Sequence, residues 1–191
     1  MAMNWYHRRL CSSEKWAKLV EKELLPWSLE DVELGDHVLE IGPGYGANLR
    51  VLVDRVPSLT ALEIDERMAR DLERGHGARA KVIHGDGAAM PLPDNEFSSV
   101  VCFTMLHHVP TAAQQDRLFS EAFRVLRPGG VFAGSDGVHR LLFRLIHVGD
   151  TYNPVPHESL PRRLAAAGFE QIEVANPDGR QQRWRAMKPE A

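Results

Sequence analysis

Cysteine is nearly absent from this chain. Only Cys11 and Cys102 occur among 191 residues, too few for a disulfide framework or for a zinc or iron–sulfur site built from four thiolates. Long apolar runs are also missing. The chain has no stretch of about 18 apolar residues, the length that spans a membrane, and residues 1–10 are not followed by an apolar segment of signal-peptide length. We therefore expect a protein of the reducing cytoplasm that is neither exported nor membrane-spanning.

A large excess of charge of either sign is missing too. The net charge is −3, so no broad basic surface for nucleic acid or anionic lipid is indicated. Hydrophobic residues make up 43% and charged residues 26% of the chain, values close to those of soluble globular domains. We expect one ordinary domain with no nucleic-acid partner.

Apolar segments of strand length alternate with helical segments along the chain. Strand character is found at 37–42, 59–64, 80–86, 97–104 and 130–135, and helical character at 47–56, 66–74 and 112–126. Nearly continuous apolar strands are typical of a parallel sheet that is buried on both faces. The alternation predicts a doubly wound α/β sheet.

Further elements are predicted before and after this alternation. A helix begins near Ser12 or Ser13 and is stopped by Pro26. After residue 136 a helix is expected over 157–169, followed by strands at 171–175 and 182–187 that form a hairpin across the turn 176–179. The complete prediction is a mostly parallel seven-stranded sheet with a C-terminal antiparallel hairpin.

Glycines are concentrated directly after the first predicted strand, in the run EIGPGYG at 40–46. Gly42, Gly44 and Gly46 permit unusual backbone angles and close approach of a ligand. In an open parallel sheet, ligands bind beyond the carboxyl ends of the strands, where this loop lies. The spacing differs from the G-x-G-x-x-G of dinucleotide sites, and Glu40 before it suits a cation better than a diphosphate.

Acidic residues also end the next two strands. Glu63 lies roughly 20 residues after the glycines, the place from which a carboxylate holds ribose hydroxyls; Asp65 takes that role if the strand register differs, and Glu63 is otherwise an ordinary acid at a helix start. The Asp86 carboxylate can accept from an exocyclic amine while the Gly87 amide donates to a ring nitrogen, which suits adenine. These residues indicate an unphosphorylated nucleoside.

At these residues the sequence resembles the class I S-adenosylmethionine-dependent methyltransferases, particularly the small-molecule, type 11-like branch. The resemblance covers about residues 38–130 and rests on the glycine loop, the run GDGAAMPLPDNEF, and the motifs LHHV and RVLRPGG. It implies a Rossmann-like fold and methyl transfer from S-adenosylmethionine to a small-molecule acceptor, with S-adenosylhomocysteine as product. A single domain of residues 1–191 would comprise a helical cap (1–35), a cofactor-binding core (36–136) and an acceptor-side region with the hairpin (137–191).

The resemblance also implies roles for individual residues. Glu63 would take the ribose, Asp86 and Gly87 the adenine, and the backbone carbonyl at Phe103 or Thr104 the methionyl amine. The methionyl part of the cofactor would contact Glu40, Gly42, Gly44 and Gly46.

Catalytic residues are less clearly indicated than cofactor residues. His107 and His108 follow the fourth strand, where either serves as a general base or simply as a packing group. His157 is a weaker candidate in the less patterned stretch that also carries His139, His147 and Asp150. No close spacing of histidines and acids predicts three convergent metal ligands, so no metal site is expected.

The segment 141–148, with Trp5 and Tyr6, either roofs an acceptor pocket or packs in the core. Two other functions compete with methyl transfer: a nicotinamide-dependent oxidoreductase, whose G-x-G-x-x-G spacing is absent, and a non-catalytic S-adenosylmethionine-binding protein on the same fold. The sequence does not choose the acceptor, the methylated atom, the use of a general base or the oligomeric state.

Overall fold

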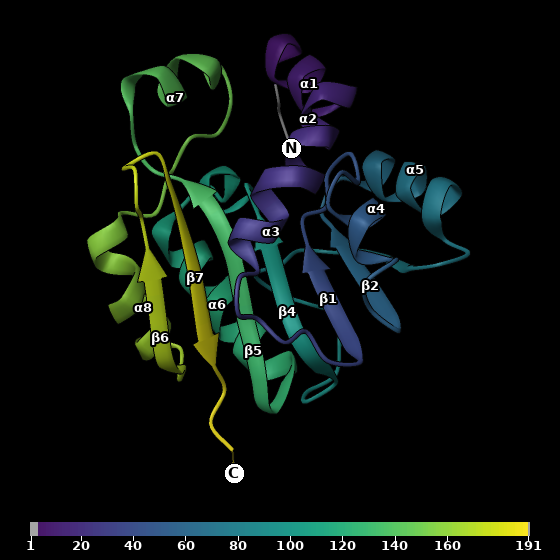
Figure 1. Ribbon diagram of the computed structural model, residues 1–191, viewed down its shortest axis with the longest axis vertical. Helices are drawn as coiled ribbons and strands as arrows, with labels where there is room; N and C mark the ends of the chain where they lie inside the picture. Colours follow the sequence, from purple (N-terminus) through teal and green to yellow (C-terminus); the bar gives the residue numbers. More distant parts are fainter. Residues whose placement is uncertain (1–3, 191) are drawn as a thin grey trace.

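A seven-stranded sheet organises residues 4–190, the part of the chain that the computed structural model describes (Figure 1). The strand order is β3-β2-β1-β4-β5-β7-β6. The strands are β1 (His37–Ile41), β2 (Ser58–Glu63), β3 (Lys81–His84), β4 (Phe97–Phe103), β5 (Leu126–Gly137), β6 (Glu170–Ala175) and β7 (Gln181–Met187).

The first five strands are parallel, and β7 is antiparallel to both β5 and β6. The predicted doubly wound, mostly parallel sheet with a C-terminal antiparallel hairpin is therefore confirmed. Within this hairpin the second strand, β7, lies next to β5, and the first strand, β6, lies at the edge of the sheet. The division into cap, core and acceptor-side region stays a prediction.

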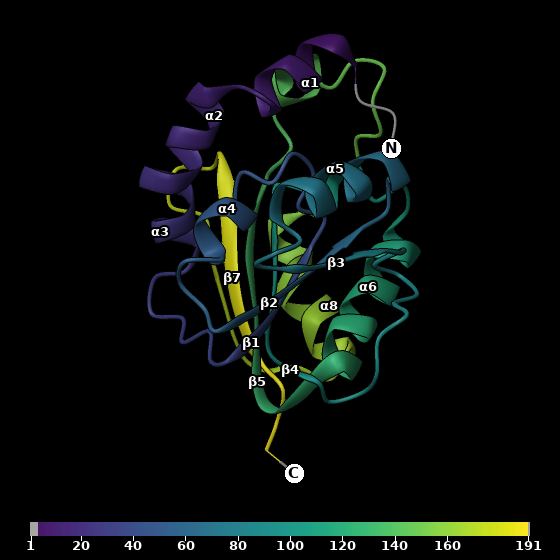
Figure 2. The ribbon, with the colours of Figure 1, turned by 90° about the vertical axis from the view of Figure 1, so that its right-hand side faces the viewer.

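The sheet is covered by helices on both faces (Figure 2). Neighbouring residues of one strand point to opposite faces. On β4, Val100 packs in the core cluster with α6 (Ala112–Val125) and α8 (Leu160–Ala166). Val101 packs in the cluster with α3 (Leu25–Ser28), α4 (Leu49–Leu52) and α5 (Glu66–His76). Both residues are fully buried. A strand buried on both faces needs apolar residues at successive positions, which is why these strands are nearly continuous apolar runs.

The N-terminal helices differ from the prediction at two places. Ser13 caps α2 (Glu14–Leu19) as expected, its side chain accepting from the amide of Trp16. After α2 the chain stays helical, first as a π-helical segment (Val20–Leu24) and then as α3 (Leu25–Ser28), so Pro26 does not end the helix. Pro26 lies in the first turn of α3, where a missing amide hydrogen costs little. A further helix, α1 (Trp5–Cys11), was not expected from the sequence.

The helix predicted over 47–56 is reduced to α4 (Leu49–Leu52). The glycine turn extends to residue 48, with the Gly46 amide bonded to the Pro43 carbonyl at 2.9 Å, so the helix begins late. After α4, the amides of Asp54 and Arg55 bond three residues back, as in a tightening turn. Helix α5 (Glu66–His76) and helix α6 agree closely with prediction.

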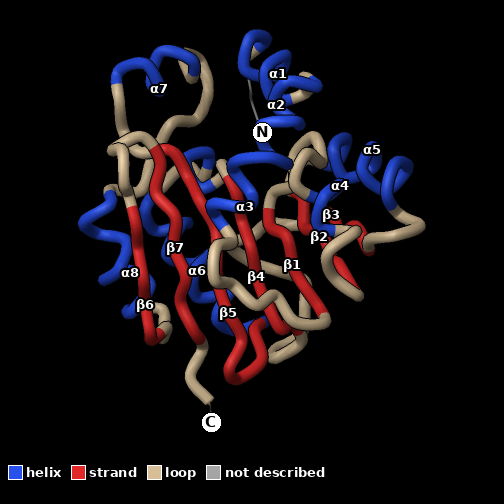
Figure 3. Tube along the Cα trace, viewed as in Figure 1, coloured by secondary structure: helices blue, strands red, loops and turns tan. Residues whose placement is uncertain are grey.

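Two helices lie beyond the carboxyl ends of the parallel strands, α1 and α7 (Leu141–Ile146) (Figure 3). Asn4 joins them, because its side-chain amide donates to the carbonyls of Ile146 and Val148 at 2.9 and 3.1 Å. A short 3-10 helix at Leu106–His108 precedes α6, and another at His157–Ser159 precedes α8. Within residues 4–190, each helix is too short or too polar to cross a bilayer.

Candidate functional site

A cavity of about 390 Å³ lies at the carboxyl ends of the parallel strands, beneath α1 and α7. Ligand pockets commonly have volumes of about 300–1,000 Å³. Most residues predicted for the site line it: Gly42, Gly44, Glu63, Asp86, Gly87, Phe103, Thr104, His107 and His108. Glu40, Gly46 and His157 are not among the lining residues. The loops of β1, β2, β3 and β4 thus meet at one site, as expected for this topology.

The glycine loop uses its glycines for different purposes. Gly44 has φ +55°, and a Cβ there would meet no heavy atom within 4 Å, so the loop leaves open space at the cavity wall. At Gly46, with φ +75°, a Cβ would lie 2.9 Å from Cδ2 of Leu72 on α5. Gly46 therefore allows close packing of α5 and does not itself line the cavity.

Glu40 lies beneath this loop at the end of β1 and is only 1% exposed. Within residues 4–190, neither of its carboxylate oxygens has a hydrogen-bond partner. Burial raises the pKa of the Glu40 carboxyl to about 8; the nearby Asn48 side chain opposes this shift in part, and the charge of Glu63 adds to it. An unpaired buried acid is costly unless a ligand or a proton satisfies it, so Glu40 suits a site for a cationic group.

Glu63, and not Asp65, reaches the cavity. One Glu63 oxygen accepts from the Gly44 amide at 3.0 Å and the other from the Asp65 amide at 2.9 Å. Burial raises the pKa of the Glu63 carboxyl. The Asp65 side chain caps α5, accepting from the amides of Arg67 and Met68, both at 3.1 Å. The glycine loop of β1 and the acid of β2 thus form one hydrogen-bonded unit.

Asp86 and Gly87 stand in the loop after β3. A Cβ at Gly87 would lie 3.0 Å from Ile41 Cγ2 and 3.1 Å from Leu118 Cδ1, so a larger residue here would require one of these side chains to shift. The Asp86 carboxylate accepts from the Ala88 amide at 2.8 Å. This turn fixes the two residues at the cavity wall.

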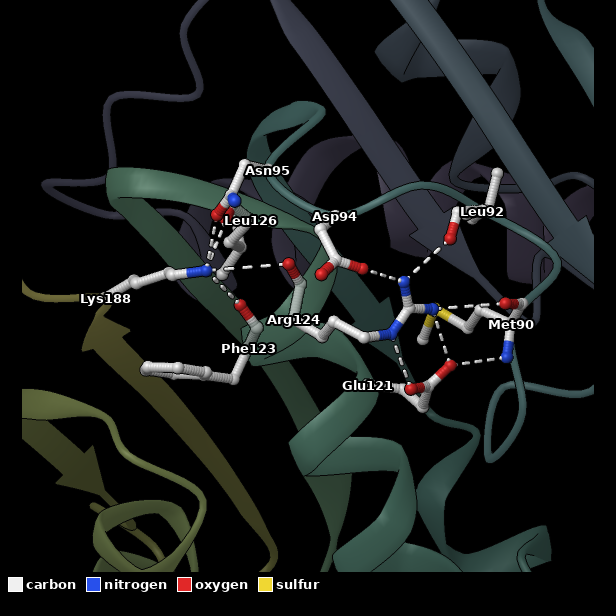
Figure 4. Close-up of polar contacts among 9 residues, drawn as sticks. All are labelled: Met90, Leu92, Asp94, Asn95, Glu121, Phe123, Arg124, Leu126 and Lys188. Atoms are coloured by element: carbon white, nitrogen blue, oxygen red, sulfur yellow. Dashed lines mark hydrogen bonds and ion pairs between the residues drawn. The ribbon is translucent and has the colours of Figure 1, made fainter.

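Arg124 on α6 holds the rest of this loop in place (Figure 4). Its guanidinium donates to the carbonyls of Met90 and Leu92 at 3.1 and 2.8 Å and to the Asp94 carboxylate at 2.7 Å. Glu121 pairs with Arg124 and accepts from the Met90 amide at 2.7 Å. The sequence analysis did not identify this arginine, because two of its partners are backbone carbonyls and Asp94 lies 30 residues away in the chain.

Thr104 follows β4 with φ +50°, an unusual conformation for a β-branched residue. Its amide donates to the Ser135 carbonyl of β5 at 2.7 Å, which fixes the strained turn. Strained backbone of this kind is concentrated at ligand-binding sites. The predicted carbonyl position at residues 103 and 104 therefore stands at a constrained part of the cavity wall.

The cavity roof comes from α1 and α7. His7, Leu10 and Cys11 line it from α1, and Phe143, Ile146 and His147 line it from the α7 segment. Leu141 is 74% exposed, so α7 is a roof and not a core helix. For Trp5 and Tyr6 neither alternative, roof or core, is confirmed, because the two residues are 73% and 56% exposed and other residues of α1 face the cavity.

Four buried histidines meet under this roof, and we call them the histidine cluster: His7, His107, His108 and His147. His107 Nδ1 lies 2.5 Å from Asp136 Oδ1, and His7 Nδ1 lies 2.8 Å from Asp150 Oδ2. The Nε2 atoms of His107 and His147 are 3.0 Å apart.

The electrostatics of the cluster favour neutral rings at two positions. Burial, with the charges of His107, His7 and His147, lowers the pKa of His108 to about 2. Burial also lowers the pKa of His147 to about 4. An imidazole with so low a pKa is a weak proton acceptor. His157 lies elsewhere, with Nδ1 3.4 Å from Gln182 Oε1.

Sequence reasoning identified part of this cluster. It singled out His107 and His108 because they follow a strand end, and noted His147 and Asp150 without joining them. His7 and Asp136 were missed. The expectation that histidines and acids do not converge fails, because His7, His108 and His147 come from segments far apart in the chain.

Residues 39–134, half of the chain, match the family model described as "Methyltransferase domain". The chain belongs to this family. The family is the type 11 branch of the class I S-adenosylmethionine-dependent methyltransferases. The resemblance seen in the sequence is therefore confirmed.

Relatives and solved structures agree with this family. A probable S-adenosylmethionine-dependent methyltransferase of Mycolicibacterium smegmatis is 39% identical over 98 residues, covering 51% of this chain and 37% of the relative. A malonyl-[acyl-carrier protein] O-methyltransferase of Geobacter sulfurreducens is 29% identical over 196 residues, covering 92% of this chain and 72% of the relative.

A Thermotoga maritima structure described as a methyltransferase, possibly a histamine N-methyltransferase, has a TM-score of 0.74. It is 19% identical and is matched over 96% of this chain and 98% of its own, which shows a shared fold. The chain spans about a third of the length of some curated relatives that it matches, 37% of one and 31% of another.

Proposed function

We propose that this methyltransferase-family protein transfers a methyl group from S-adenosylmethionine to a small-molecule acceptor bound under the roof of α1 and α7. The observation that carries the proposal is the hydrogen bond between the Gly44 amide and Glu63. It joins the glycine loop and the strand-end acid at one cavity wall. Nothing in the comparisons favours the oxidoreductase alternative.

The residues present fit the proposed cofactor. The open space at Gly44 admits a ligand against the backbone, and the unpaired, buried Glu40 favours a positive charge nearby. Glu63 would hold the ribose hydroxyls, and Asp86 with the Gly87 amide the adenine. The carbonyl at Phe103 or Thr104 would accept from the methionyl ammonium, and Glu40, Gly42 and Gly44 would surround the methionyl part.

The chemistry asks little of acid–base groups. The bound cofactor supplies a methyl group already activated on a sulfonium, so the protein mainly aligns the acceptor and excludes water. The roof residues Leu10, Phe143 and Ile146 are apolar and line the cavity, which suits water exclusion. Asp136 holds the His107 ring in a fixed orientation at the same wall.

The class of acceptor is small and at least partly apolar. Among the relatives are a fatty-acid O-methyltransferase of Mycolicibacterium smegmatis and a sterol 24-C-methyltransferase of Gibberella zeae. The two names differ in the methylated atom, so they support small apolar acceptors without fixing one.

Cys11 and Cys102 are both free thiols, which supports the cytoplasmic location that we propose.

The test is ligand binding to the wild type and to two variants. S-adenosylhomocysteine at about a hundred times its Kd should raise the unfolding temperature by about 5–10 °C, while NAD should not. Glu63→Gln should weaken S-adenosylhomocysteine binding by about 10- to 100-fold, since a hydrogen bond to a charged group contributes about 1.5–3 kcal/mol.

Asp65→Asn is the matched control, because asparagine also caps helices and Asp65 is not among the cavity-lining residues. Its affinity for S-adenosylhomocysteine should equal that of the wild type. A response to NAD alone would refute the proposal. Equal weakening by both variants would remove Glu63 from its proposed role.

A further inference from the structure

Three members of the histidine cluster converge in the manner of metal ligands. His7 comes from α1, His108 from the 3-10 helix after β4, and His147 from the residue after α7. One ring nitrogen of each lies within 4.8 Å of those of the other two, and all three residues are buried. Three imidazoles that share one small volume are a common set of zinc ligands.

The second nitrogen of each ring is already engaged. His147 Nδ1 lies 2.6 Å from the Phe143 carbonyl and His108 Nδ1 lies 3.3 Å from the Thr151 carbonyl. His7 Nδ1 lies 2.8 Å from a carboxylate oxygen of Asp150. Oxygen acceptors require a proton on each Nδ1, and a neutral ring protonated there keeps its lone pair on Nε2.

This arrangement is the usual outer shell of a metal-bound histidine, in which the second ring nitrogen donates to a carboxylate or a carbonyl. Such a contact fixes both the tautomer and the orientation of the ring. Asp150 is further held by the backbone amide and the side chain of Asn4. The supporting contacts therefore exist for all three rings and leave Nε2 of each for a metal, although Nε2 of His147 also lies 3.0 Å from His107 Nε2.

His107 adds a reason for a cation here. Its Nδ1 faces Asp136, and its Nε2 lies 3.0 Å from His147 Nε2. Two Nε2 lone pairs at this distance repel each other unless a proton or a cation lies beside them. The buried carboxylates of Asp136 and Asp150 supply the negative charge that a cation in this low-dielectric space requires.

We propose that His7, His108 and His147 bind one divalent transition-metal ion of the zinc class through Nε2. Nitrogen ligands favour such ions over magnesium or calcium. Metal–nitrogen bonds of about 2.0–2.1 Å place tetrahedral ligand atoms about 3.3 Å apart, so the rings draw closer when the ion binds. Three protein ligands leave a fourth position open, as in catalytic zinc sites.

The open position faces the cavity, because all three histidines line it. If the proposed methyl transfer holds, on which this step rests, that position takes the acceptor through an anionic sulfur or oxygen atom. A metal-bound thiol or hydroxyl would lose its proton to solvent at neutral pH. The resulting anion would bond to the methyl carbon as the bond from that carbon to the cofactor sulfur breaks, and S-adenosylhomocysteine would leave. The acceptor class is then a small molecule with a thiol, phenol or similar acidic group.

The test uses the metal-free protein titrated with Co²⁺, whose visible absorption reports tetrahedral nitrogen ligation, followed by displacement with Zn²⁺. The wild type should bind one Co²⁺ per chain. His7→Ala and His147→Ala should each weaken binding by at least tenfold. His139→Ala, which removes an exposed histidine outside the group, should bind as the wild type does.

Folding and cofactor binding are checked separately. S-adenosylhomocysteine affinity should be retained in His139→Ala, which lies outside the cavity lining, and circular dichroism should be retained in His7→Ala, since His7 lies on α1 outside the sheet. Cofactor binding without stoichiometric Co²⁺ binding would overturn the metal site alone. Co²⁺ binding without cofactor binding would overturn the proposed function and leave the site standing. A Co²⁺ spectrum that does not change when a small thiol is added would overturn the proposal of an open fourth coordination position.

Discussion

Glu40 is a buried carboxyl at the end of β1. The strand that ends in the glycine loop places this carboxyl under the loop, where it is buried and neither oxygen has a hydrogen-bond partner within the described residues. Such a group is tolerated mainly as the neutral acid. The cost of ionising it appears in the pH dependence of folding.

The substitution Glu40→Gln should remove this pH dependence. The pKa rises from 4.5 to about 8 in the folded state, so folding favours the protonated form. Its stabilising contribution is complete below pH 4.5 and is lost as pH rises toward 8, by about 1.4 kcal/mol per pH unit. The wild-type free energy of unfolding should therefore fall by a few kcal/mol relative to the variant.

Urea unfolding of both proteins at pH 5, 6.5 and 8 measures the difference. Other titrating groups are shared by the two proteins and cancel in the comparison. A difference in unfolding free energy that stays constant across these pH values would contradict the environment assigned to Glu40.

Individual site residues were predictable where chain order fixes their place. Glu63 and Asp86 follow strands of a parallel sheet, whose carboxyl ends meet at one edge, so adjacency follows from position in sequence. His7 lines the cavity only through the docking of α1, and Asp136 contacts His107 only through the course of β5. Their contacts depend on tertiary packing, which local spacing does not report.

At the scale of elements, the loop between β3 and β4 depends on a helix that it does not adjoin in sequence. Arg124→Lys should loosen this loop, because lysine cannot reproduce the planar fork that reaches Met90, Leu92 and Asp94. We expect a loss of about 1–2 kcal/mol in unfolding free energy, since the side chain is partly exposed, and several-fold weaker binding of S-adenosylhomocysteine.

Calorimetry with S-adenosylhomocysteine and urea unfolding measure the two effects. Arg117→Lys is the control, since Arg117 is exposed on the same helix. Equal behaviour of the two variants would show that the Arg124 contacts do not hold the loop.

Element boundaries were predicted where helix and strand patterns are long and regular, as in α5, α6 and β4. Predictions failed where tertiary context decides. Pro26 suits the first turn of α3 as well as it suits a helix stop, and only packing selects between them. The apolar segment of α7 has the same composition whether it roofs a cavity or fills a core.

At the scale of the whole molecule, Trp184 joins three strands. It sits on β7 opposite Gly134 of β5 and Val174 of β6, and a Cβ on Gly134 would lie 2.7 Å from its ring. Trp184→Ala should lower the unfolding free energy by about 3–5 kcal/mol, because it leaves a large cavity in the core.

Thermal and urea unfolding followed by circular dichroism measure this loss. Trp5→Ala removes an exposed indole and should change the unfolding free energy by less than about 0.5 kcal/mol. Comparable losses in both variants would contradict a core that spans β5, β6 and β7.

The position of β7 between β5 and β6 also sets an order of assembly during synthesis. The ribosome makes β6 before β7, yet β6 has no place in the sheet until β7 has paired with β5. Until residues 181–187 emerge, the growing chain carries β5 with one edge unpaired, the kind of edge on which other strands add. Between the translation of residue 137 and that of residue 187, this edge of β5 is therefore open to mispairing.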